Sequence, residues 1–106
     1  MLKPFFVWEN RKLKRIDPAE VACLVADKNY TKIWLRDGTE YMVRATLTNA
    51  LKKLPPDMFI KIHRAAVASV YFMDSISRDH LMAGIHTIPI GKQYYKSLIN
   101  KLNIIE

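Results

Sequence analysis

The residue types that most often carry out chemistry in proteins are present in this chain, but not at the spacings that known reactions use. The 106 residues contain no GxSxG, HExxH or glycine-rich phosphate-binding sequence. His63, His80 and His86 show no metal-ligand spacing, and the single cysteine has no CxxC partner. The aspartates stand mostly beside turn-forming residues, which Asp favours without any catalytic role. We therefore expect no enzymatic activity, no cofactor, no bound metal and no small-molecule substrate.

Positive charge is the stronger chemical signal in this sequence. The chain has 17 Lys and Arg residues against 10 Asp and Glu residues, which gives a net charge of +7. A surplus of this size on a small protein favours a polyanionic partner, most often nucleic acid. No stretch approaches the ~18 uncharged apolar residues that a membrane-spanning helix needs, so no membrane partner is expected. Because Cys23 is alone, we expect no disulfide within the chain, a buried thiol, and the reducing cytoplasm as the compartment.

The first of three cationic segments lies at the entry to an expected strand. Lys28 and Lys32 can engage phosphates there, while Asn29 or Tyr30 reaches a base edge. The alternative is an ordinary hairpin turn with solvated lysines, because Asn is common in turns whatever their function.

The second and third cationic segments follow later strands. In the second, Arg64 is expected to project from the strand end and to offer a fork of donors to guanine or phosphate. His63, beside it, is more simply explained by structural hydrogen bonds. In the third, Lys92 and Lys96 lie four residues apart, on one face of a helix whose first N–H groups can bind an anion. The alternative for the third is an ordinary strand-to-helix connection with solvated lysines.

Alternating side chains indicate a domain built mainly from short strands. Thr31, Ile33 and Leu35 share one face of an alternating run, as a half-buried strand requires. An Asp-Gly pair follows, and a second alternating run begins after it, so the two runs predict a hairpin. Further strands are expected at residues 5–8, 13–16, 59–62, 67–73 and 85–90.

Helical signals in the sequence are short. Asp17 can cap a single turn that begins with a proline. Thr46 can cap a segment with apolar residues at spacings of three and four, and Pro55 ends it. The same spacing returns from Tyr95 onwards. Since no repeat or linker divides the chain, we expect one mainly β domain over residues 1–106 with three small helices.

Five short motifs follow one another between residues 29 and 92. They are NYTKI from residue 29, DGTEYMVR from 37, TL from 46, FIKIHR from 59 and IPIGK from 88. In this order they resemble the LytTR-type DNA-binding domain of bacterial response regulators, over about residues 5–103. The resemblance implies a mainly all-β fold of elongated antiparallel sheets with two or three short helices. It also implies sequence-specific binding of double-stranded DNA by loops, rather than a recognition helix, in the major groove.

The resemblance assigns base and phosphate contacts to the three cationic segments. The matching positions are Lys28, Asn29, Tyr30, Lys32, His63, Arg64, Gly91, Lys92, Gln93 and Lys96. The chain departs from the family pattern at Ala65 and Ser69, where Ser and Asn are usual, and in reading Gly-Lys where Ser-Arg is usual.

The resemblance also implies a setting for the protein. Such domains act in transcription regulation in bacterial two-component systems, as the output of a response regulator in the cytoplasm. Because one small domain contacts only a short DNA sequence, we expect two copies, as a homodimer, on repeated half-sites. Because Met1 stands only a few residues before the first expected strand, no receiver domain fits ahead of it.

Two other functions remain open from the sequence. The departures at Ala65, Ser69 and Gly91 favour a protein-interaction module that has lost most DNA binding and pairs with a related full-length regulator. Alternatively, Tyr30 and Trp34 on one strand face can stack the bases of single-stranded nucleic acid, with basic residues beside them.

Overall fold

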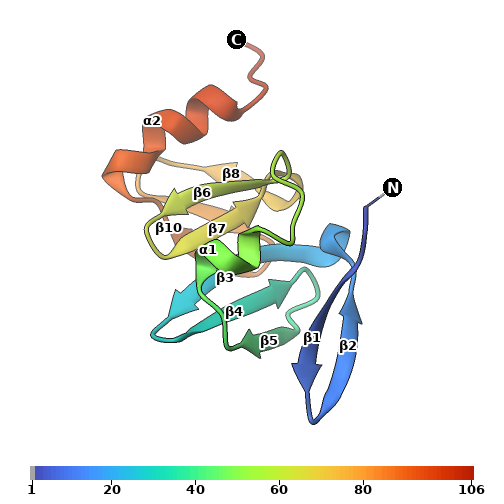
Figure 1. Ribbon diagram of the computed structural model, residues 1–106. Coiled ribbons are helices and arrows are strands. Elements are labelled where there is room, and N and C mark those ends of the chain that lie inside the picture. Colours follow the sequence, from blue (N-terminus) through green and yellow to red (C-terminus); the bar gives the residue numbers. More distant parts are fainter. Residues whose placement is uncertain (1) are drawn as a thin grey trace.

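Three antiparallel sheets and two α-helices make up the computed structural model, which describes residues 2–106. The largest sheet has the order β5-β4-β3-β7-β6 and lies between a two-stranded and a three-stranded sheet (Figure 1). Its strands are β3 (Val21–Asp27), β4 (Tyr30–Leu35), β5 (Glu40–Val43), β6 (Phe59–His63) and β7 (Ala66–Ser69). The small sheets are β1 (Phe5–Glu9) with β2 (Lys12–Ile16), and β8 (Ser75–Ile76), β9 (His80–Ala83) and β10 (His86–Pro89).

The helices are short, as expected for the predicted fold class. They are α1 (Leu47–Leu51) and α2 (Lys92–Lys101), with 3₁₀ turns at Pro18–Glu20 and Val70–Phe72. The molecule is elongated, with extents of 48 × 32 × 24 Å. A mainly β fold of elongated antiparallel sheets with two short α-helices is therefore confirmed. Within residues 2–106, no helix has the length and apolar character that crossing a membrane demands.

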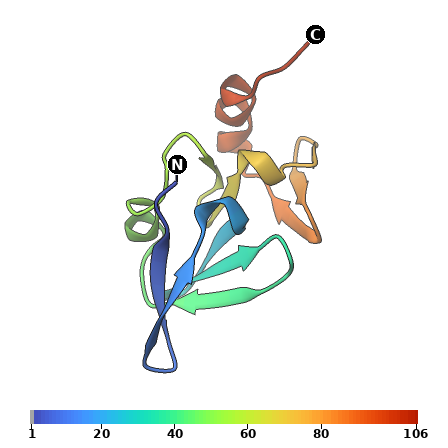
Figure 2. The ribbon, with the colours of Figure 1, turned by 90° about the vertical axis from the view of Figure 1, so that its right-hand side faces the viewer.

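The hydrophobic core has two layers, one on each face of the five-stranded sheet. Leu24 and Val67 are fully buried on the face that the β1–β2 hairpin and α1 cover. Cys23 and Ala68 are fully buried on the opposite face, under the three-stranded sheet and α2. In Figure 2 the blue hairpin lies at the lower left of the sheet and the orange strands lie at its right. The central strands are thus covered on both sides, which makes the large sheet a rigid support for the turns at its ends.

The predicted helix starts are present with the expected caps. Asp17 accepts a hydrogen bond from the Ala19 amide at 2.9 Å, and Thr46 accepts one from the Asn49 amide at 3.1 Å. The hairpins predicted around Asn10 and around the Asp-Gly pair are also present, as β1–β2 and β4–β5.

Some expected elements differ from the observed ones. The strand expected over residues 67–73 ends at Ser69, whose hydroxyl accepts from the Tyr71 amide at 3.3 Å and starts a 3₁₀ turn instead. Strand β3 and the short strands β8 and β9 had no prediction at all. The first four residues of β3 are buried on both faces of the sheet, so its side chains are apolar from Val21 to Ala26 and show no alternation.

Candidate nucleic-acid interface

The first cationic segment forms the tight turn between β3 and β4. Asp27 pairs with Tyr30 across the turn, so Lys28 and Asn29 occupy its two central positions. Lys28 has a φ of +58°, a left-handed conformation that costs a residue with a side chain about 1 kcal/mol. Lys28, Asn29 and Tyr30 are exposed, whereas the Lys32 ammonium lies 3.5 Å from the Asp27 carboxylate. Lys32 is therefore partly neutralised, and Lys28 is the more available cation.

The second segment forms the turn between β6 and β7, beside the first. Strands β3 and β7 pair through Val25 and Ala66, and the Ala26 amide donates to the Ala65 carbonyl at 2.8 Å. Arg64 is exposed at the turn. The half-buried His63 accepts a hydrogen bond from the Ala65 amide at its Nδ1, at 3.1 Å, which supports the structural role expected for this histidine.

The third segment joins β10 to α2 and lies against the second. The Gly91 amide donates to the Ile62 carbonyl at 2.8 Å, which ties the start of α2 to the end of β6. A shallow hollow of about 180 Å³ forms where they meet, lined by His63, Arg64, Gly91, Lys92, Gln93 and Tyr94. A β-carbon on Gly91 would lie 2.9 Å from the Tyr94 ring and 3.7 Å from the His63 ring, so a side chain at this position would crowd the hollow.

A fourth cation, Arg44, stands at the same end of the sheet and was not among the expected contact residues. Arg44 follows β5, and the buried Thr31 hydroxyl donates to the Ala45 carbonyl at 2.8 Å, which holds this connection beside β4. Since Thr31 pairs with Val43, the chain leaves β5 next to the β3–β4 turn. The pairing of β4 with β5 and the Thr31 hydrogen bond place Arg44 there, and the motif that Arg44 ends does not by itself show which end of the sheet it reaches.

These connections all lie at one end of the five-stranded sheet, on the left in Figure 1. We call this end the cationic edge; its basic residues are Lys28, Lys32, Arg44, Arg64, Lys92 and Lys96. The fold thus brings the three cationic segments together, although they are far apart in the sequence. A surface of this kind can contact several phosphates of one polyanion at once.

The geometry gives little support to the alternative that Tyr30 and Trp34 stack the bases of single-stranded nucleic acid. The Trp34 ring is half-buried and stacks on His86, with ring centroids 4.6 Å apart and planes 5° apart. Its indole N–H also donates to Glu40. Since His86 already occupies one face of this half-buried ring, Tyr30 is the exposed member of the expected pair.

One polar cluster lies at the turn before β9. Ser77 Oγ lies 3.0 Å from His80 Nδ1 and 3.4 Å from His80 Nε2, the Asp79 carboxylate lies 2.8 Å from Nδ1, and all three residues are exposed. The His80 ring holds the pKa of the Asp79 carboxyl below its usual range, and the Thr39 amide does the same for Asp37. Over residues 2–106, no three potential ligands gather into a metal site.

Comparisons with known proteins agree with this geometry. The family model of the LytTr DNA-binding domain matches residues 11–103. Among solved structures, the chain is similar to one described as the LytTr DNA-binding domain of a methyl-accepting/DNA response regulator from Bacillus cereus. That similarity has a TM-score of 0.81 and 19% sequence identity, and covers 95% of this chain and 97% of the other. No curated protein matches the sequence.

Proposed function

Because the chain belongs to the LytTr DNA-binding domain family, we propose that it recognises a specific double-stranded DNA sequence with its cationic edge. DNA binding in transcription regulation is the function of the family. The observation that carries the finer proposal is the meeting of three cationic segments at one end of the five-stranded sheet. Loops at this end enter the major groove, and the sheet behind them holds their spacing.

The side chains at the cationic edge divide into two roles. Arg64 reads guanine, because its planar fork fits two acceptors in the major groove. Asn29 and Tyr30 offer hydrogen bonds to neighbouring base edges. Lys28 and Lys92 contact phosphates, which positions the domain without specifying sequence.

The start of α2 strengthens the phosphate contacts. Gly91 caps this ten-residue helix without any side-chain hydrogen bond, so the first backbone N–H groups stay free for an anion. Lys92 and Lys96 lie on one helical face beside these donors. The Gln93 amide is exposed at the same turn and adds a donor towards the groove. His63 acts indirectly, by holding the Ala65 amide and with it the loop that carries Arg64.

A salt titration tests the electrostatic part of this proposal. Fluorescence anisotropy of a labelled random-sequence duplex gives the binding constant at each salt concentration. If about six phosphates are contacted, log K falls with log salt at a slope near −5. An affinity that is insensitive to salt, or undetectable at low salt, contradicts the proposal.

Selection from a random duplex pool tests sequence specificity. We expect one enriched motif, and a spacing of two motif copies by about one helical turn or a multiple of it if two domains bind repeated half-sites. Competition with the corresponding single strands should leave the duplex complex intact. A pool that shows no enrichment contradicts specific recognition, and enrichment of a lone motif contradicts the two-copy arrangement.

A further inference from the structure

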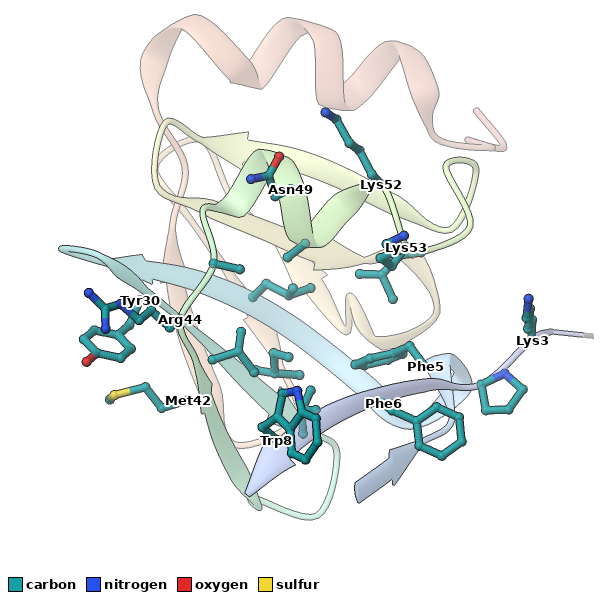
Figure 3. A pocket seen from close by; sticks show the side chains of 18 residues that line it. Lys3, Phe5, Phe6, Trp8, Tyr30, Met42, Arg44, Asn49, Lys52 and Lys53 are labelled. Atoms are coloured by element: carbon teal, nitrogen blue, oxygen red, sulfur yellow. The ribbon is translucent and has the colours of Figure 1, made fainter. Parts of the chain in front are cut away.

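A large open groove lies beside the cationic edge, between strand β1, strand β5 and helix α1 (Figure 3), and shares Tyr30 and Arg44 with that edge. Its volume is about 1000 Å³, and its floor reaches the buried side chains of Leu24 and Ile33. Within residues 2–106, β1 pairs with β2 alone and β5 pairs with β4 alone, so each of these strands keeps one unpaired edge. The hairpin and the large sheet thus lie side by side without sharing a ladder.

Large apolar side chains line this groove without being buried. Phe6 is 54% exposed, Trp8 is 70% exposed and Met42 is 48% exposed. The apolar surface continues past the groove to Leu13, which pairs with Trp8 across the hairpin and is 55% exposed. A contiguous apolar surface that includes a tryptophan is typical of a contact surface for another molecule.

Positive charge surrounds the apolar surface. Lys3, Arg44 and Lys53 stand around the groove in Figure 3. Among the described residues that line it, none carries a carboxylate. An occupant with negative charge beside its apolar side chains is therefore complementary to this surface.

We propose that the groove docks a segment of another protein that has apolar side chains on one face and carboxylates beside them. A second copy of this chain is a poor occupant, because it carries a net charge of +7 and its own hairpin adds Lys12, Lys14 and Arg15. A small amphiphile leaves part of the surface uncovered, because the apolar strip runs beyond the groove to Leu13. The docking needs no DNA, so it stands or falls independently of the proposed function.

Display of random peptides tests the proposal without assuming a partner. The intact chain is immobilised, and peptides are selected at moderate salt in the absence of DNA. We expect the enriched peptides to combine Asp or Glu with Leu, Phe or Trp. The best one is then synthesised with a fluorescent label, and its affinity is measured by polarisation.

Matched variants locate the binding. Trp8→Ser should weaken the labelled peptide by about tenfold or more, whereas Tyr71→Ser, at a 75% exposed aromatic outside the groove, should leave it unchanged. Lys53→Glu should weaken it by about fivefold, whereas Lys101→Glu at the far end of α2 should not. These positions are exposed, and circular dichroism checks that each variant is folded.

Several results would overturn the proposal. The proposal is wrong if no peptides are enriched, or if the enriched peptides lack acidic residues. It is also wrong if Trp8→Ser leaves the affinity for the peptide unchanged. Sedimentation that shows a dimer lost on Trp8→Ser makes a second copy the occupant instead. Binding of sodium oleate, in the absence of any peptide binding, makes a small amphiphile the occupant.

Discussion

Arg64 is the residue on which sequence recognition depends most in this proposal. It is exposed at the β6–β7 turn, and it shares a hollow with the start of α2. Replacing Arg64 with Ala should weaken specific binding by about 1–3 kcal/mol and relax the preference at one base position. Arg15→Ala removes an equal charge from the exposed hairpin and is the matched control. Anisotropy with the selected duplex and its point variants measures both effects; unchanged affinity and preference would show that the β6–β7 turn is not the reading element.

Lys92 has a different expected effect, because it contacts a phosphate. Lys92→Ala should weaken binding to all duplexes to a similar extent and reduce the salt slope by about 1. Lys101→Ala, at the other end of the same helix, is the control and should leave the slope unchanged. A loss confined to one DNA sequence would instead give Lys92 a role in base recognition.

The reactivity of a single residue, Cys23, tests whether the core around β3 is buried. Burial raises the pKa of its thiol to about 12, from an ordinary value of 9.0. The thiol should therefore react slowly with a disulfide reagent at pH 8 in the folded protein and rapidly in urea. Above pH 9 the thiol ionises in the unfolded chain but stays neutral in the folded protein until about pH 12. The free energy of unfolding should therefore fall as the pH rises from 9 to 12, and show no effect of this thiol below pH 9. Rapid labelling without urea would mean that β3 is not buried as described.

At the scale of elements, one hydrogen bond joins strand β4 to the connection that carries Arg44. The Thr31 side chain is fully buried, and its hydroxyl donates to the Ala45 carbonyl at 2.8 Å. Thr31→Val keeps the shape but leaves that carbonyl without its partner, which should lower the free energy of unfolding by about 1–3 kcal/mol. Urea denaturation should show a lower midpoint with an unchanged slope. An unchanged midpoint would mean that water or another donor replaces the hydroxyl.

At the scale of the whole molecule, the cationic edge and the apolar groove meet. Tyr30 and Arg44 belong to both surfaces. Arg44→Glu should therefore weaken both the duplex and the acidic peptide, whereas Lys92→Ala should weaken only the duplex and Lys53→Glu only the peptide. Parallel anisotropy measurements on the three variants check this pattern. Equal losses of both ligands in all three variants would point to general charge effects instead of two surfaces.

The sequence by itself determined the local structure of the chain. Alternating residues predicted β4 and β5, and capping residues predicted the helix starts at Asp17 and Thr46. These elements can be predicted because a half-buried strand or a helix cap restricts the types of residues that lie close together in the sequence. The central strand β3 escaped prediction for the converse reason, since burial on both faces removes the alternation.

Only the tertiary structure decided which of these local pieces act together. The turn at Lys28, the turn at Arg64 and the start of α2 share one edge because β3 pairs with β7 and the Gly91 amide bonds to Ile62. Arg44 joins them through the pairing of β4 with β5 and the Thr31 hydrogen bond. The groove beside β1 exists because the hairpin packs against the large sheet without extending it. Pairing between distant segments depends on the packing of the whole chain, so no local pattern of residues encodes it.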